Sequence, residues 1–258
     1  MPTFITLLKI FMAPTLIGLA SLAGRKWGPA ISGWIVGMPL TTGPIIFLLA
    51  VQQGTPYATT TVLGTVSGGF SLMIFALTYS WLARRFRWPI TLTISSGLFF
   101  AATFILQQQT FALLPLCATI VGLLMITLRL MPPDGTSAPA KPIILPWWDL
   151  PARMIVVTTL VLFLTTFSAS LGPRLTGLLA TFPVYASTLS AFAHHLQGPA
   201  AAARVQRGLL LGLFSFAGFY LWLGLTLQPM GMAIGFGGAI IVALLIQGAS
   251  LWVLQRAK

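Results

Sequence analysis

Two segments of the sequence are similar to each other: residues 28–54 (GPAISGWIVGMPLTTGPIIFLLAVQQG) and residues 172–198 (GPRLTGLLATFPVYASTLSAFAHHLQG). The similarity continues beyond the first segment at the same offset of 144 residues. It gives 13 identities in the 50 positions from Gly28 to Leu77 without a gap, whereas shared composition gives roughly four. The chain is therefore predicted to contain an internal duplication.

Each copy of this segment has a proline near its middle, Pro39 in the first and Pro183 in the second. A proline inside a helix removes one backbone hydrogen bond and clashes with the carbonyl four residues back. In lipid the freed groups need new partners, and small hydroxyl side chains follow both prolines. The pattern predicts either two broken helices that meet at a midplane site or two ordinary proline kinks.

The composition excludes most soluble proteins. Apolar residues make up 57% of the 258 residues, charged residues 6%, and mean hydropathy is +0.95, whereas a soluble domain is about 25% charged. A soluble enzyme, a nucleic-acid-binding domain and a disordered protein are therefore excluded. The 14 Lys and Arg residues, against 2 Asp and Glu, are scattered between long apolar runs. Such scattering makes the lipid bilayer, and not nucleic acid, the expected partner.

The apolar runs are long enough for nine membrane-spanning helices of about 20 residues each. We expect an all-α polytopic bundle with a 4+1+4 plan. Its parts are a first four-helix repeat (1–107), a connecting helix (108–130), a cytoplasmic linker (131–150) and a second four-helix repeat (151–258). The predicted helices are Thr3–Ala23, Pro29–Val51, Ala58–Ala83, Pro89–Leu106, Thr110–Leu130, Pro151–Leu171, Pro173–Leu196, Ala201–Leu227 and Met230–Leu254.

The odd fifth helix makes the second repeat enter the membrane from the opposite face, an inverted-topology repeat of the kind found in many secondary transporters. With the N-terminus outside, only Lys9 and Arg174 of the 14 basic residues fall on the outer side. Basic residues collect in cytoplasmic loops. We therefore expect a bacterial inner-membrane protein with a periplasmic N-terminus and a cytoplasmic C-terminus.

Two glycine pairs at helical spacing, Gly64 with Gly68 and Gly208 with Gly212, recur at the same offset. Small residues one turn apart let helices approach closely. They are expected to pack the third and eighth helices together or against their neighbours.

The residues that follow the two prolines, together with one basic residue near the start of each repeat, are the candidates for a substrate pathway. The basic pair either extends to the nearest interface or favours an anionic substrate at the two mouths of the pathway. The pathway candidates are Lys9, Pro39, Thr41, Thr42, Arg153, Pro183, Tyr185, Ser187 and Thr188.

The two histidines, His194 and His195, are adjacent. They form either an interfacial pair or a pH-sensitive gate. Adjacent helical residues point about 100° apart, so they are poorly placed to chelate one metal ion. With no nucleotide-binding or hydrolase motif and no Asp or Glu in any predicted span, we expect no enzyme activity, no cofactor, no metal site and no carboxylate-based ion coupling.

The second half also carries a family resemblance. Arg153, Gly177, Phe182–Pro183, His194 and Gly198 match the pattern of a basic residue, then Gly, Phe-Pro, Ala-His and Gly. In this pattern the second half resembles the GlpM family of small bacterial inner-membrane proteins associated with alginate production. The first half has Met38 and Ala50 where the pattern has Phe and His. The resemblance implies a fused, inverted pair of GlpM-like units.

These observations predict a small secondary transporter or permease whose second and seventh helices line the pathway, for a substrate that the basic residues favour as an anion. Two alternatives remain open at this point. One is a non-transporting scaffold for cell-envelope or exopolysaccharide production, and the other is a flippase for a lipid carrier. A homo-oligomer is compatible with all three.

Overall fold

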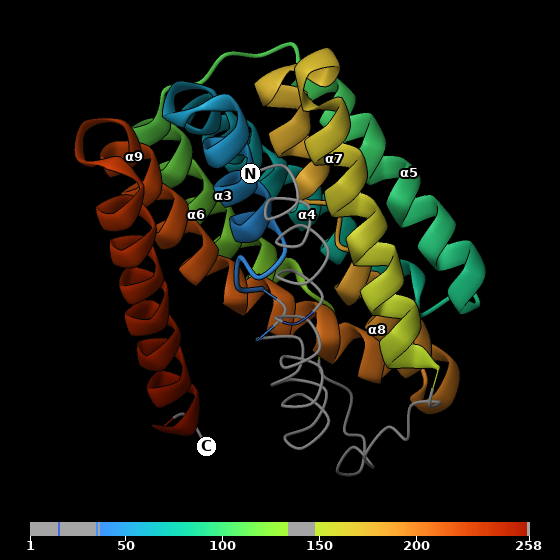
Figure 1. Ribbon diagram of the computed structural model, residues 1–258. Helices are drawn as coiled ribbons and strands as arrows, with labels where there is room; N and C mark the ends of the chain where they lie inside the picture. The colour runs from blue at the N-terminus through green and yellow to red at the C-terminus, as the bar shows by residue number, and fades with distance from the viewer. Residues whose placement is uncertain (1–14, 16–34, 36, 134–147, 257–258) are drawn as a thin grey trace.

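The computed structural model describes residues 15, 35, 37–133 and 148–256, and in this part of the chain every regular element is an α-helix (Figure 1). The elements are α3 (Thr42–Gln53), α4 (Thr55–Leu82), α5 (Trp88–Leu106), α6 (Leu113–Leu130), α7 (Asp149–Ala180), α8 (Val184–Gln197) and α9 (Pro199–Arg256). The predicted all-α class is confirmed. The nine-helix count is not, because all but residue 15 of the predicted helix Thr3–Ala23 and most of the first half of Pro29–Val51 lie outside the described residues.

Within the described residues, five helical segments are long and apolar enough to cross a membrane, as expected of a membrane-embedded protein. Two of them, Leu150–Gln197 with 48 residues and Pro199–Ser250 with 52, exceed twice the roughly 20 residues that one crossing needs. A non-helical glycine with a positive φ interrupts each, Gly172 (φ 77°) in α7 and Gly231 (φ 79°) in α9. Glycine adopts this conformation without steric cost, so α7 and α9 are each divided into two arms, and Leu150–Gln197 is interrupted again between α7 and α8.

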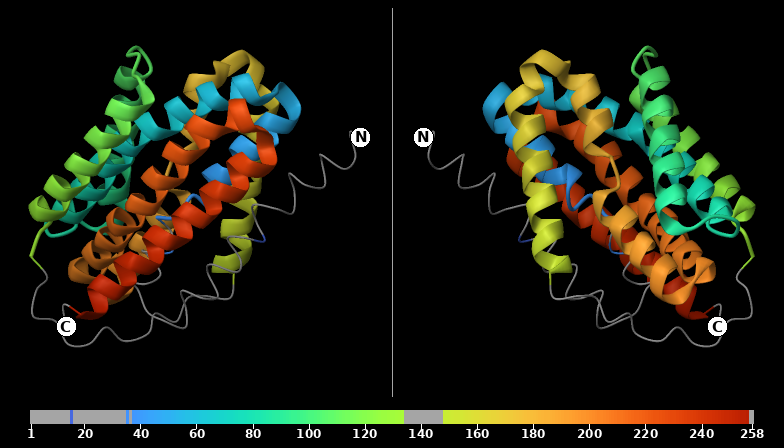
Figure 2. Two further views of the ribbon diagram at one scale, coloured as in Figure 1. Left: turned by 90° about the vertical axis from the view of Figure 1, so that its left-hand side faces the viewer. Right: turned by 90° about the vertical axis from the view of Figure 1, so that its right-hand side faces the viewer.

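The two arms of α9 form a hairpin, which is seen from the side in Figure 2. The indole of Trp222 donates a hydrogen bond of 3.4 Å to the carbonyl of Ile234. Farther from the turn, Gly218 in the first arm faces Val242 and Ile246 in the second. The predicted boundary at Gln228–Pro229 is therefore two to three residues too early. Pro229 is accommodated within the last turn of the first arm, and Gly231 reverses the chain.

Helix α4 is the centre of the bundle and packs against α3, α5, α6, α7 and α9. Most of its residues are buried, among them the large side chains of Phe75 and Tyr79. The outer helices instead expose apolar side chains, for example Phe104 on α5 and Leu245 on α9, which are 63% and 68% exposed. Polar residues would cover this surface in a soluble protein, so its apolar character fits contact with lipid.

The described parts of the two copies share local geometry. Gly54 ends α3 with φ 88° and ψ 165°, and its counterpart Gly198 ends α8 with φ 86° and ψ −179°. The two helices run in opposite directions, because α3 passes into α4 at the upper end of Figure 1 and α8 passes into α9 at the lower end. Opposite direction with the same local shape is the arrangement that an inverted repeat requires.

Contacts between the two copies are related by the same offset of 144 residues. Gly68 of α4 packs against Thr181, and Gly212 of α9 packs against Gly37. A Cβ added to Gly37 would come within 2.5 Å of the Gly212 Cα atom. Residues 37 and 181, and residues 68 and 212, are each 144 apart. Each contact is thus the other with the copies exchanged.

The glycine pairs were predicted to pack the third and eighth helices together or against their neighbours. These contacts confirm the second alternative, packing against neighbouring helices. Gly64 packs against the backbone of Arg174, and Gly177 packs against the backbone of α4 at Thr61 and Thr65. The partner is therefore the proline-broken helix of the other copy.

Substituting Gly177→Ala tests this packing, because its Cβ would meet the backbone nitrogen of Thr65 at 2.7 Å. Overpacking against rigid backbone costs about 1–3 kcal/mol, so thermal unfolding in detergent should occur at a lower temperature. The matched control is Gly97→Ala in α5, where a Cβ meets nothing within 4 Å. This change should stabilise the helix by about 0.5–1 kcal/mol. Equal melting temperatures for both variants would contradict the assigned contact.

Candidate functional site

The first helix break covers residues 37–41, between the helical residue Ile35 and the start of α3. Pro39 lies buried within it. Its carbonyl accepts a hydrogen bond of 2.9 Å from the N–H of Gly43, and the carbonyl of Met38 accepts one of 2.7 Å from Leu40. The carbonyls on either side of the proline are therefore occupied by short local turns, as an apolar environment demands.

The second break covers residues 181–183, between α7 and α8. The hydroxyl of Thr181 donates to the carbonyl of Leu178 at 2.6 Å, and the N–H of Phe182 donates to Leu179 at 3.1 Å. Pro183 has φ −81° and ψ 59°, outside the helical region. The predicted interruption at both prolines is confirmed, and each is a true break and not a bend within a continuous helix.

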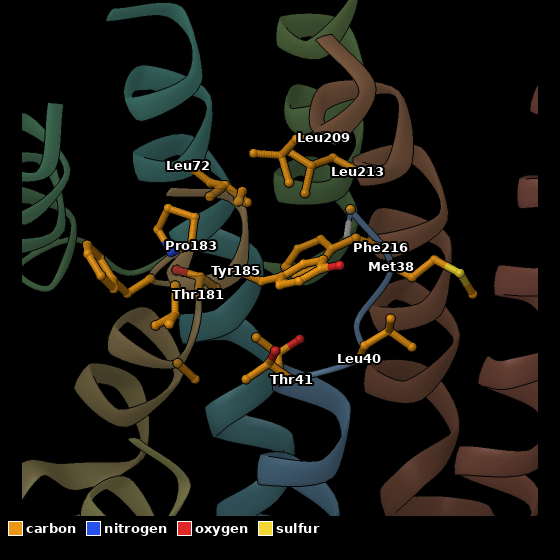
Figure 3. Close-up of a pocket in the computed structure, with 16 residues that line it drawn as sticks. Met38, Leu40, Thr41, Leu72, Thr181, Pro183, Tyr185, Leu209, Leu213 and Phe216 are labelled. Carbon is orange, nitrogen blue, oxygen red and sulfur yellow. The ribbon is translucent and has the colours of Figure 1, made fainter. Parts of the chain in front are cut away.

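Both breaks line one cavity of about 50 Å³ (Figure 3). Its lining consists of residues 37, 38 and 40–42, at the first break and the start of α3, and of residues 180–186, around the second break. Leu72 of α4 and Leu209, Leu213 and Phe216 of α9 complete the lining. One water needs about 10–15 Å³ on this measure. The cavity therefore has room for a few waters or a small ligand.

The predicted pathway residues divide into two groups. Thr41, Thr42, Pro183 and Tyr185 line the cavity, and Pro39 is buried in the break beside it. Ser187 and Thr188 do not line it; their hydroxyls donate to the carbonyl of Val184 at 2.9 and 2.8 Å. In the first turn of a helix these side chains bond back to the backbone.

The predicted basic pair cannot be placed, because Lys9 and the side chain of Arg153 lie outside the described residues. Thr181 and Phe182 line the cavity although the sequence analysis did not select them. The offset gave no signal for them, because their counterparts Gly37 and Met38 were not candidates either.

The histidines lie at the far end of α8 from the cavity. The ring of His194 contacts the backbone of Ala83 and lies edge-on to Tyr79, with ring centroids 6.2 Å apart. His195 is exposed. His194 thus belongs to the contact between α8 and the end of α4, and its gating role stays a prediction.

Two buried polar pairs differ in how they are satisfied. The side-chain amide of Gln206 donates to the hydroxyl of Ser190 at 2.9 Å, which ties α9 to α8. The hydroxyls of Thr42 and Tyr220, 6% and 0% exposed, lie beside each other. Neither of their oxygens has a hydrogen-bond partner of good geometry. The Thr42 hydroxyl thus faces Tyr220 in the core and not the open volume of the cavity.

A scan of protein-family models and searches of curated proteins and of solved structures found no match to this chain. The resemblance to the GlpM family therefore stays a prediction.

The two polar pairs predict losses of stability of different size. Ser190→Ala strands the buried amide of Gln206, and an unsatisfied buried group costs about 1–3 kcal/mol. Thr42→Val keeps the shape and loses no well-formed hydrogen bond, so its cost should be on the order of 0.5 kcal/mol. Thermal unfolding of the purified variants measures both effects. Thr42→Val being the more destabilising change would show that its hydroxyl has a structural role.

Proposed function

We propose that this protein is a small secondary transporter of the bacterial inner membrane that works by alternating access around the two helix breaks. The observation that carries the proposal is that both breaks, 144 residues apart in sequence, line one cavity. Binding sites in inverted-repeat transporters lie between such interrupted helices.

The relation between the copies supports the mechanism. Because α3 and α8 run in opposite directions, exchanging the conformations of the two copies would turn a cavity that opens to one face into one that opens to the other. Gly68–Thr181 and Gly37–Gly212 are the equivalent contacts at which such an exchange would act. In this proposal the chain has nine crossings in the 4+1+4 plan.

The positions of basic residues support the proposed orientation. The indole of Trp81 donates to the carbonyl of Leu130, and the guanidinium of Arg207 donates to the carbonyl of Pro132, both at 2.9 Å. These contacts bring together the ends of α4 and α6 and the first arm of α9. Six described arginines lie in or beside these segments: Arg84, Arg85, Arg87, Arg129, Arg204 and Arg207. Arg174 instead donates to the carbonyl of Leu106 at the end of α5.

One observation favours the lipid-carrier flippase as a second candidate. Phe182 lines the cavity and stacks on Phe100 with ring centroids 5.1 Å apart, and Phe100 is 47% exposed on the apolar surface of α5. A single pair of aromatic rings therefore separates this wall of the cavity from the surface assigned to lipid. Among the described residues no contact favours the scaffold alternative.

Cysteine labelling tests alternating access. The chain has one cysteine, the buried Cys117, so Cys117→Ala gives a cysteine-free background. In that background Thr41→Cys should react with a membrane-impermeant thiol reagent in both right-side-out and inverted vesicles, because the cavity opens to each face in turn. The control Leu245→Cys, on the lipid-facing surface of α9, should stay unlabelled because a thiol in hydrocarbon does not ionise.

The labelling pattern also separates the three candidates. Reaction from neither side would contradict transport and leave the scaffold. Reaction that appears only after Phe100→Ala would indicate the lateral route of a flippase.

A reporter fused after Lys258 tests the orientation. Nine crossings with basic residues inside place the C-terminus in the cytoplasm, so green fluorescent protein fused there should fluoresce and alkaline phosphatase should be inactive. Fusions after Gln108, in a predicted outer loop, should give the opposite result. Active phosphatase at Lys258 would refute the nine-helix topology.

A further inference from the structure

Polar side chains collect where α4, α5, α8 and the first arm of α9 meet, near the end of the bundle at which α8 passes into α9 (Figure 1). The side-chain amide of Gln206 on α9 donates to the hydroxyl of Ser190 on α8 at 2.9 Å. One turn after Ser190, the ring of His194 lies edge-on to Tyr79 of α4, with ring centroids 6.2 Å apart. These contacts join three of the four helices.

The register of α5 against α4 adds Ser95 to this group. Residues 83–87 turn the chain back, so α5 packs antiparallel to α4. The hydroxyl of Thr103 on α5 donates to that of Ser71 on α4 at 2.9 Å. Eight residues farther along α4 is Tyr79, and eight residues back along α5 is Ser95. Both are buried, and they therefore lie at the same height between the two helices.

The register of α9 against α4 places Gln206 at this height as well. The first arm of α9 runs antiparallel to α4, and Gly69 of α4 faces the ring of Phe216 on α9. Ten residues farther along α4 is Tyr79, and ten residues back along α9 is Gln206. Ala202, one turn before Gln206, packs in the same buried cluster as Tyr79. We call the residues at this height the polar layer: Tyr79, Ser95, Ser190, His194 and Gln206.

The polar layer is buried but incompletely satisfied. The hydroxyls of Tyr79 and Ser95 and the side-chain carbonyl of Gln206 make no hydrogen bond of good geometry with the described residues. All three residues are 0% exposed. A polar group that loses water without gaining a partner raises the free energy of the closed arrangement. Parting the four helices would admit water to these atoms, which lowers the cost of opening at this level.

The polar layer lies between the cavity and the arginine-rich end of the bundle. Phe99, one turn from the layer on α5, contacts Phe182 of the cavity lining, with ring centroids 5.3 Å apart. On α9, Leu209 of the lining is three residues from the layer. In the other direction, the exposed Arg84 and Arg85 follow the layer on α4 by five and six residues. A path from the cavity to water at this end therefore crosses the layer.

The equivalent positions of the other copy are entirely apolar. The offset of 144 residues maps the polar layer onto Ile46, Ala50, Val62, Leu223 and Ala239. All five have an exposure of 4% or less and belong to one hydrophobic cluster. Exchanging the copies maps the cavity onto itself, so this apolar layer lies on its opposite side. Opening there would bring apolar side chains into water, which is unfavourable, so the two sides of the cavity differ in how readily they hydrate.

We propose that the polar layer is the passage by which a water-soluble, hydrogen-bonding substrate moves between the cavity and the arginine-rich face, and that the packing of the four helices closes it in this structure. The stranded polar atoms gain partners from water or from such a substrate, whereas a hydrocarbon chain would leave them unpaired. The inference rests on the proposed transport function and adds the class of its substrate and the side of the cavity that opens more readily.

Matched cysteines at equivalent positions test the passage. Ser95→Cys and Ala239→Cys are made separately in the Cys117→Ala background. Both positions hold small residues and are 0% exposed, so the closed structure gives no reaction at either. A membrane-impermeant thiol reagent on the face that labels Arg85→Cys should react with Ser95→Cys. It should do so at least about tenfold faster than with Ala239→Cys from either face, because one stranded polar group shifts opening by such a factor.

Two results of the cysteine experiment would overturn the passage. One is equal reactivity at the two positions, including no reaction at either. The other is reaction of Ser95→Cys with a lipid-soluble reagent alone, which would assign a route for lipid and not for a water-soluble substrate.

Two tyrosine variants locate the effect. Tyr79→Phe removes a stranded hydroxyl from the layer and so favours the closed passage, and labelling of Ser95→Cys should slow by roughly fivefold to tenfold. The matched control is Tyr220→Phe, whose hydroxyl is equally buried and also lacks a partner of good geometry but lies outside the layer. It should leave the labelling rate unchanged. Unchanged labelling in Tyr79→Phe, or equal slowing in both variants, would contradict the assignment.

The passage and alternating access fail in different ways. Labelling of Thr41→Cys from both faces while Ser95→Cys stays unreactive would retain transport and overturn the passage. Labelling of both cysteines from the arginine-rich face alone would retain the passage and overturn alternating access.

Discussion

The structure depends on the rule that backbone N–H and C=O groups need partners wherever water is absent. Pro39 and Pro183 break that rule in the middle of two apolar helices, and the rest of the bundle accommodates the result. Short turns at Met38, Phe182 and their neighbours satisfy the carbonyls. Helix α4 and the first arm of α9 close over the breaks, and glycines at residues 68 and 212 let the chain at the breaks approach closely. The two breaks meet at a partly open cavity.

Much of this architecture follows from sequence because its causes are local. Two prolines in repeated segments interrupt their helices, and a glycine before Pro173 separates two helices that periodicity alone would join. The predicted boundary between the two arms of α9, at Gln228–Pro229, was misplaced because two signals compete there. A proline is tolerated near the end of a helical arm, while the reversal needs the positive φ of Gly231.

The cavity was only half predictable for geometric reasons. Selecting the hydroxyls after each proline assumed that they all face one site, but successive residues of a helix turn by about 100°. Tyr185 therefore lines the cavity while Ser187 and Thr188 do not. Residues before the proline, Thr181 and Phe182, lie in the non-helical part of the break, where no periodicity says which way a side chain points. The walls from Leu72, Leu209 and Phe216 are contributed by tertiary packing, which local sequence does not encode.

The reciprocal glycine contacts have a consequence for how such a chain can have arisen. Each break is held by a glycine of the opposite copy, Gly68 at Thr181 and Gly212 at Gly37, so one copy by itself lacks the surface that encloses its own break. An ancestor with a single copy would have needed a second molecule inserted upside down, and therefore a chain without a fixed orientation in the membrane. Gene fusion removes that requirement. Each half can then carry its own charge pattern, and the two walls of the cavity can differ, as they do at Met38 and Phe182.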